Sequence, residues 1–129
     1  MDFYISWNDW NTPPEGTVVI ENLSVVGTRH ENRDGTSRQD AFSKLEKWAV
    51  VNAVREPNNP YDPNAIAIVS EHGQIGYIAS EEAVKLSQMI DTGYKPLAKL
   101  SALFSCPDDT LGGKIELHLL PSSENMSSV

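Results

Sequence analysis

Residues 55–68 read REPNNPYDPNAIAI, a polar turn with three prolines that runs directly into an apolar, partly β-branched stretch. Each proline fixes its own φ near about −65° and favours extended geometry in the residue before it, so Asn59 and Asp62 are both restricted. The turn displays amide, phenol and carboxylate groups on a backbone ordered in advance. Such a segment loses little entropy when it meets a ligand, so we interpret it as a binding turn before a strand.

A purely structural turn is the alternative, because Asn and Asp before proline bond local backbone groups. Tyr61 favours the binding role, since its ring, held between Pro60 and Asp62, could stack on a base or another planar group. The Asp62 carboxylate would repel a phosphate but accept a hydrogen bond from a sugar hydroxyl. The pair therefore favours a free 3′ end over the interior of a strand, where that oxygen is esterified.

The 129 residues of the chain are an ordinary size for one domain whose core needs no disulfide or structural metal. The 18 acidic and 10 basic side chains give a net charge of −8, which opposes strong nonspecific binding to nucleic acid. Cys106 is the single cysteine, and the sequence has neither a secretory start nor a membrane-length apolar segment. We therefore expect an intracellular, cytoplasmic protein with no membrane span.

Three segments are expected along the chain. They are an aromatic N-terminal arm at 1–16, a folded domain at 17–120 and a Ser-rich tail at 121–129 that is too polar to order itself. The arm either packs on the domain or on a second copy of the protein, or forms a stacking surface beside the site. Its aromatic residues are Phe3, Tyr4, Trp7 and Trp10.

Short β-branched and apolar runs predict a mainly β protein with helical additions, built as a small curved or closed sheet of the barrel type. A clear helix is expected before the last two strands, because Ser80 is a natural N-cap, acidic residues follow it, and Gly93 can end the element. A short helical turn is expected near 41–45. The expected strands are 17–28 with a break near Glu21 and Asn22, 48–54, 64–70, 74–79, 97–105 and 114–120.

Catalytic and metal chemistry has weak support in the sequence. His30, His72 and His118 are far apart, no nucleophile elbow is present, and Cys106 has no nearby partner that would activate it. The stretch 58–64 has acidic and amide side chains at calcium-loop spacing but lacks the mid-loop glycine and terminal glutamate of such a loop. We therefore expect a protein that is not an enzyme and that holds no metal or cofactor.

In the proline turn and the segments on either side of it, the chain resembles the HIRAN domain, found at the N-terminus of some fork-remodelling DNA helicases and as stand-alone proteins in bacteria. The resemblance begins at VVGTRH (25–30), passes through 55–66 and continues through QIGYI (74–78) into the following helix and the last two strands. It implies an OB-like β-barrel with helical additions. In the helicase members it implies a pocket for the 3′-hydroxyl end of single-stranded DNA.

The resemblance also implies roles for residues of the turn and its neighbours. Asp62 would hold the terminal hydroxyl, Tyr61 would be one wall of a base-stacking clamp, and Asn59 would support the turn or contact the nucleotide. Arg29 matches a family arginine near the DNA backbone. Tyr77 occupies a position that can approach the ligand.

The chain departs from the helicase domains at several positions. His30 falls where they present a second aromatic wall, and an imidazole ring offers less stacking area than a phenol. Ser80 stands where they can place a basic residue, which leaves fewer phosphate contacts here. Phe104 is a possible neighbour of the site but is expected in the core.

These observations predict a non-catalytic module that binds the 3′-hydroxyl end of single-stranded DNA or a nucleotide, in the context of DNA repair. The alternative is a protein-interaction or self-associating barrel that has lost DNA binding. In that alternative the arm at 1–16 would contact a protein partner or a second copy of the chain. The acidic net charge and the missing aromatic and basic positions keep both hypotheses open.

Overall fold

The computed structural model of the protein describes residues 12–121. The four aromatic residues of the predicted arm, and the predicted tail from 122 onward, lie outside the described residues. Neither helix in the described part of the chain has the length and apolar character needed to cross a membrane.

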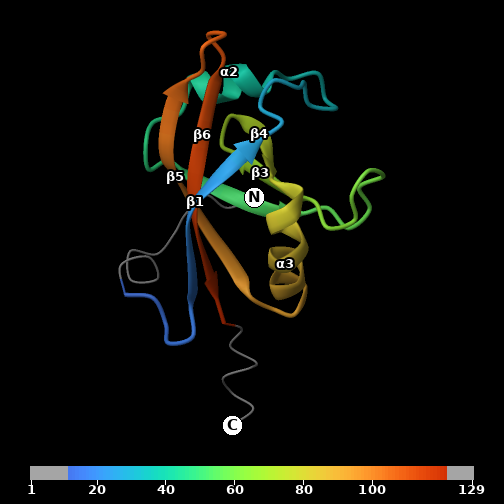
Figure 1. Cartoon of the computed structure of the whole chain (residues 1–129), viewed down its shortest axis with the longest axis vertical. Helices are drawn as coiled ribbons and strands as arrows, with labels where there is room; N and C mark the ends of the chain where they lie inside the picture. Colours follow the sequence, from blue (N-terminus) through green and yellow to red (C-terminus); the bar gives the residue numbers. More distant parts are fainter. Residues whose placement is uncertain (1–11, 122–129) are drawn as a thin grey trace.

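Six antiparallel strands within residues 12–121 close into a barrel in the order β1-β4-β3-β2-β5-β6 (Figure 1). This confirms the prediction of a mainly β, OB-like barrel with a clear helix before the last two strands. The strands are β1 (Val18–Val26), β2 (Val50–Arg55), β3 (Ile66–Ser70), β4 (Gly73–Ile78), β5 (Lys95–Ser105) and β6 (Leu111–Leu120), and the helices are α2 (Arg38–Ser43) and α3 (Ser80–Asp91).

Strand β1 closes the barrel by pairing with two different strands. Its first part pairs with β6, and its last residues, Val25 and Val26, pair with Ile78 and Tyr77 of β4. The register shifts between Ile20 and Leu23, where Asn22 has a φ of 60°. A bulge of this kind bends and twists a strand. Strand β1 is nevertheless continuous and still pairs with β6 at Leu23 and Ser24, so the break predicted near Glu21 and Asn22 is a bulge within the strand.

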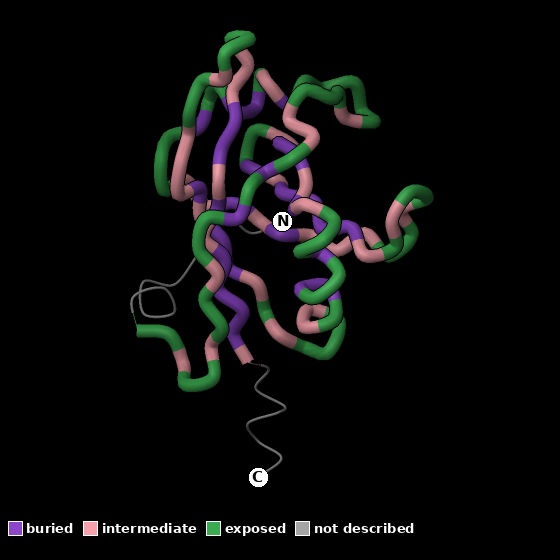
Figure 2. Tube along the Cα trace, in the orientation of Figure 1, coloured by how far each residue is buried: buried purple, intermediate pink, exposed green. Residues whose placement is uncertain are grey.

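The hydrophobic core fills the inside of the barrel. Figure 2 shows the buried segments running along the strands, while the connecting loops are mostly exposed. Helix α2 contributes Phe42, which is fully buried and packs beside Gly113 of β6. The fully buried apolar strand residues with the largest side chains are Ile66, Ile68, Ile75, Leu100, Ile115, Leu117 and Leu119.

The boundaries of β6 and β2 differ from those predicted. Strand β6 begins at Leu111, so Gly112 and Gly113 lie in the strand rather than in the preceding loop. A Cβ on Gly112 would lie 2.8 Å from the Phe104 ring, so the partner strand occupies that space. Strand β2 begins at Val50, because Trp48 has a φ of 72°, which regular strand geometry does not allow.

Two expectations about single side chains are wrong. Ser80 is the first helical residue of α3 and not its cap, since the N-cap is Ala79, which makes no side-chain capping bond. Phe104 is not a core residue: it is 45% exposed and its ring covers Gly112 on the outside of the sheet. Its position near the end of the long β5 strand places it beyond the packed interior.

Candidate nucleic-acid interface

An open cavity of about 1090 Å³ lies among the loop after β1, the loop between β2 and β3, and strand β4. Figure 1 shows both loops projecting on the same side of the barrel, on the right of the view. The volume is at the upper end of what binding sites for small molecules offer. The sequence-predicted site residues that line it are His30, Asn59, Tyr61, Asp62 and Tyr77.

The proline turn is held by its own side chains. Asn59 Oδ1 accepts hydrogen bonds from the backbone N–H groups of Tyr61 at 2.9 Å and Asp62 at 3.2 Å. Asp62 Oδ1 accepts from the N–H of Asn64 at 2.9 Å, and its Oδ2 has no hydrogen-bond partner within residues 12–121. The Tyr61 side chain is 93% exposed. The turn thus presents a free aromatic ring and an available carboxylate oxygen next to each other.

Glu56 connects the turn to the barrel. Its Oε1 accepts hydrogen bonds from the Tyr77 hydroxyl at 2.7 Å and from Asn59 Nδ2 at 3.0 Å. Tyr77 belongs to β4, so this carboxylate joins the strand to the loop on the other side of the cavity. Glu56 lies within the proline-turn motif and directly follows β2, but its role is not predicted from the sequence.

Arg38 is a second cavity residue that is not predicted from the sequence. Its side chain lines the cavity although the residue is only 9% exposed. The guanidinium donates from Nε to Asn32 Oδ1 at 2.8 Å and from Nη1 to the carbonyl of Gly27 at 2.7 Å, and its carbon lies 5.3 Å from the centre of the Tyr77 ring. Tyr77 therefore has Arg38 over its ring and Glu56 on its hydroxyl.

Arg29 is not among the residues that line the cavity. Its Nη2 lies 2.9 Å from Oδ2 of Asp108 and its Nε donates to Thr110 Oγ1 at 3.2 Å, in the turn between β5 and β6. Hydrogen bonds from Thr110, with a smaller contribution from Arg29, hold the pKa of Asp108 below its usual value. A DNA-backbone contact by Arg29 stays a prediction, and His30 is the neighbour that faces the cavity.

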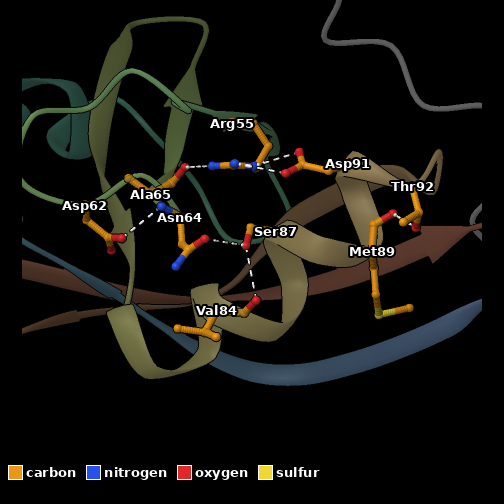
Figure 3. A network of polar contacts seen from close by, with 9 residues as sticks. All are labelled: Arg55, Asp62, Asn64, Ala65, Val84, Ser87, Met89, Asp91 and Thr92. Atoms are coloured by element: carbon orange, nitrogen blue, oxygen red, sulfur yellow. Dashed lines mark hydrogen bonds and ion pairs between the residues drawn. The ribbon is translucent and has the colours of Figure 1, made fainter.

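Residues of helix α3 contact both sides of the loop that holds the proline turn, at Arg55 and at Asn64 (Figure 3). Arg55 donates from Nε and Nη2 to the two carboxylate oxygens of Asp91 at 2.9 and 3.0 Å, and from Nη1 to the carbonyl of Ala65 at 2.9 Å. Ser87 Oγ lies 3.4 Å from Asn64 Oδ1. These contacts hold the start of the loop at Arg55 and its end at Asn64 and Ala65, just before β3.

The side chains that line the cavity offer an exposed aromatic ring, hydrogen-bonding groups and charged groups. Within residues 12–121, no group of three or more His, Cys, Asp or Glu side chains could hold a metal ion.

Comparisons with known proteins agree with this architecture. The HIRAN domain model matches residues 22–102. A crystal structure of a protein from Lactobacillus plantarum is similar with a TM-score of 0.63 and 23% identity, over 80% of this chain and 96% of that one. The crystal structure of the HIRAN domain of human HLTF is similar with a TM-score of 0.61 and 23% identity, over 88% of this chain and 87% of that one. No curated protein sequence is matched.

The chain belongs to the HIRAN domain family, because the family model matches more than half of it. The two solved structures share its fold. The family consists of DNA-binding modules rather than catalytic domains.

Proposed function

We propose that the protein binds the 3′-hydroxyl end of single-stranded DNA in the cavity between the two loops. The observation that carries this proposal is the adjacent display of the exposed Tyr61 ring and the available Oδ2 of Asp62 on a turn fixed by Asn59. The ring offers a stacking surface for the terminal base. The carboxylate offers an acceptor for the terminal hydroxyl.

The carboxylates of the cavity favour a strand end over a continuous strand. Asp62 and Glu56 both line it, and each would repel a phosphate placed against it. A 3′ terminus presents a hydroxyl donor at that place, whereas an internal nucleotide presents an esterified oxygen followed by a phosphate. The carboxylates of Asp62 and Glu56 would thus disfavour binding of an internal nucleotide in the cavity.

Three further residues complete the proposed site. His30 faces the cavity from the loop after β1 and would form a second stacking wall opposite Tyr61. Tyr77 lies on β4 with its hydroxyl held by Glu56, and would bound the space where the terminal sugar lies. Arg29 lies beside the β5–β6 turn and would meet the strand farther from its end.

The test is fluorescence anisotropy with a short single-stranded DNA that ends in a free 3′-hydroxyl, compared with the same strand 3′-phosphorylated, at low and moderate salt. We expect a preference for the free end, and weakening with salt because phosphate contacts release counterions. Asp62→Ala should weaken binding to the free end and remove the preference. Asp40→Ala is the matched control, since this exposed aspartate lies on α2 and does not line the cavity.

Equal affinity of the wild type for free and blocked ends would overturn the proposal. No binding to either strand at low salt would favour the protein-interaction alternative.

A further inference from the structure

We infer that Arg38 binds a phosphate in this cavity, so that the DNA end lies with its backbone toward the loop after β1 and its hydroxyl toward the proline turn. The inference rests on the proposed function and adds to it the orientation of the ligand and the residue that recognises its charge.

Arg38 is a buried cation without an acidic partner. In the described part of the chain, no carboxylate lies within ion-pair distance of it, and its hydrogen-bond acceptors are the neutral oxygens of Asn32 and Gly27. Burial of a charge is costly, and buried charges are usually paired. The Tyr77 ring offsets part of this cost. The Arg38 guanidinium would therefore stabilise an anionic ligand that binds in the cavity.

The guanidinium has donors left for such an anion. Nε and Nη1 are engaged, whereas Nη2 has no partner within residues 12–121 and is not among the polar atoms closed off from solvent. Because Arg38 lines the cavity, these remaining N–H groups would be available to a ligand bound there. A planar guanidinium held by two fixed bonds loses little freedom when it binds a phosphate.

Tyr77 lies between the cation of Arg38 and the carboxylate of Glu56. Arg38 lies over its ring, and Glu56 binds its hydroxyl. The exposed Arg33 lines the same cavity from the loop after β1, and Asp34 beside it uses Oδ1 to accept from the N–H and hydroxyl of Thr36. Two arginines and one carboxylate line this side of the cavity, whereas Glu56 and Asp62 line the side of the proline turn, so a ligand with a phosphate at one end and a hydroxyl at the other would be favoured with its phosphate toward Arg38.

The first experiment uses the wild-type protein and three strands with a free 3′-hydroxyl. One has native linkages, one has its last two linkages at the 3′ end replaced by neutral methylphosphonates, and the third has its first two linkages at the 5′ end replaced. We expect the 3′ replacement to weaken binding about tenfold, since hydrogen bonds to charged groups are among the strongest. The 5′ replacement should have a much smaller effect.

The second experiment compares Arg38→Gln with Lys44→Gln, which removes the same charge from an exposed position outside the cavity. Arg38→Gln should weaken binding of the native strand by about the same factor, and the 3′ methylphosphonates should then have no further effect. Lys44→Gln should respond to the neutral linkages as the wild type does. Thermal unfolding shows whether each variant is folded, and if Arg38→Gln is not, the wild-type comparison decides.

The outcomes separate the two proposals. A wild type that prefers the free 3′ end but binds the native and 3′-neutral strands equally would overturn the phosphate site and leave the proposed function. A folded Arg38→Gln that still responds to the 3′ methylphosphonates would also overturn it. A wild type with no preference for the free end would overturn the proposed function, and this inference with it.

Discussion

The hydroxyl of Tyr77 lies 2.7 Å from Oε1 of Glu56, and the same oxygen accepts a hydrogen bond from Asn59 at 3.0 Å. A single carboxylate oxygen thus links β4 to the proline turn. Because Asn59 in turn binds the backbone at Tyr61 and Asp62, Glu56 acts on the predicted ligand contacts through Asn59. In the proposed function it is a positioning residue.

Glu56→Ala should weaken binding to a free 3′ end several-fold and lower the free energy of unfolding by about 1–2 kcal/mol, because two donors lose their acceptor. Glu56→Gln keeps an acceptor oxygen and should restore most of the stability. Anisotropy and urea unfolding measure the two effects, with the exposed Glu46→Ala as control. Unchanged binding by a folded Glu56→Ala would show that Asn59 and Tyr77 hold their positions without it.

Tyr61→Ala should cost about 1–3 kcal/mol of binding free energy, the usual contribution of a base stacked on an aromatic ring. Stability should not change, because the side chain is 93% exposed. Trp48→Ala is the control for loss of an exposed aromatic ring outside the cavity. Equal affinities of Tyr61→Ala and wild type would remove Tyr61 from the site.

Asp91→Asn should change how stability depends on pH. Hydrogen bonds from Arg55 hold the pKa of Asp91 below its usual value. A carboxyl with a lowered folded pKa adds stability above its unfolded pKa of about 4, and this stability is lost as the pH falls through the folded pKa. The wild type should therefore be more stable than Asp91→Asn near neutral pH, and the difference should shrink below about pH 4.

Urea unfolding of both proteins across this pH range measures that difference. Asp34 and Asp108, whose pKa values are also lowered, are present in both proteins, so their contributions cancel. If the difference in the free energy of unfolding stays constant down to low pH, the charge of Asp91 in the Arg55–Asp91 pair does not contribute to stability.

Gly76→Ala should destabilise the barrel by about 1–3 kcal/mol, the usual cost of overpacking a closed interior. A Cβ at this position would lie 2.4 Å from the carbonyl oxygen of Val26 and 2.8 Å from Cγ1 of Val25, so β1 would have to move. Gly35→Ala is the control, since no atom lies within 4 Å of its added Cβ and only its positive φ of 86° opposes the substitution. Equal unfolding midpoints for the two variants would show that β1 moves to accommodate the added methyl group at little cost in stability.

The sequence predicts best the features that depend on neighbouring residues. The proline turn and the end of α3 near Gly93 follow from local backbone preferences and lie where expected. The break expected near Asn22 is only a bulge in a continuous strand. Gly112 and Gly113 look like turn residues in the sequence. Their place in a strand depends on β5, whose atoms occupy the positions that a Cβ on either glycine would take, and this cannot be seen from neighbouring residues.

Arg38 could not have been assigned to the site from sequence. It is separated from Tyr77 by nearly forty positions along the chain, and only the packing of α2 beside β4 brings the two together. Glu56 was visible in the motif, but its role depends on the Tyr77 hydroxyl, which reaches it from another strand.

Strand β1 pairs with β4 at Val25–Ile78 and Val26–Tyr77, and three of these four residues also line the cavity. The seam where the cylinder of strands closes is therefore a wall of the site. Separation of β1 from β4 would remove part of the cavity wall. A DNA end bound there as proposed would therefore stabilise the pairing of the two β-strands. In the proposed function, the affinity for DNA and the stability of the β1–β4 pairing are therefore thermodynamically linked.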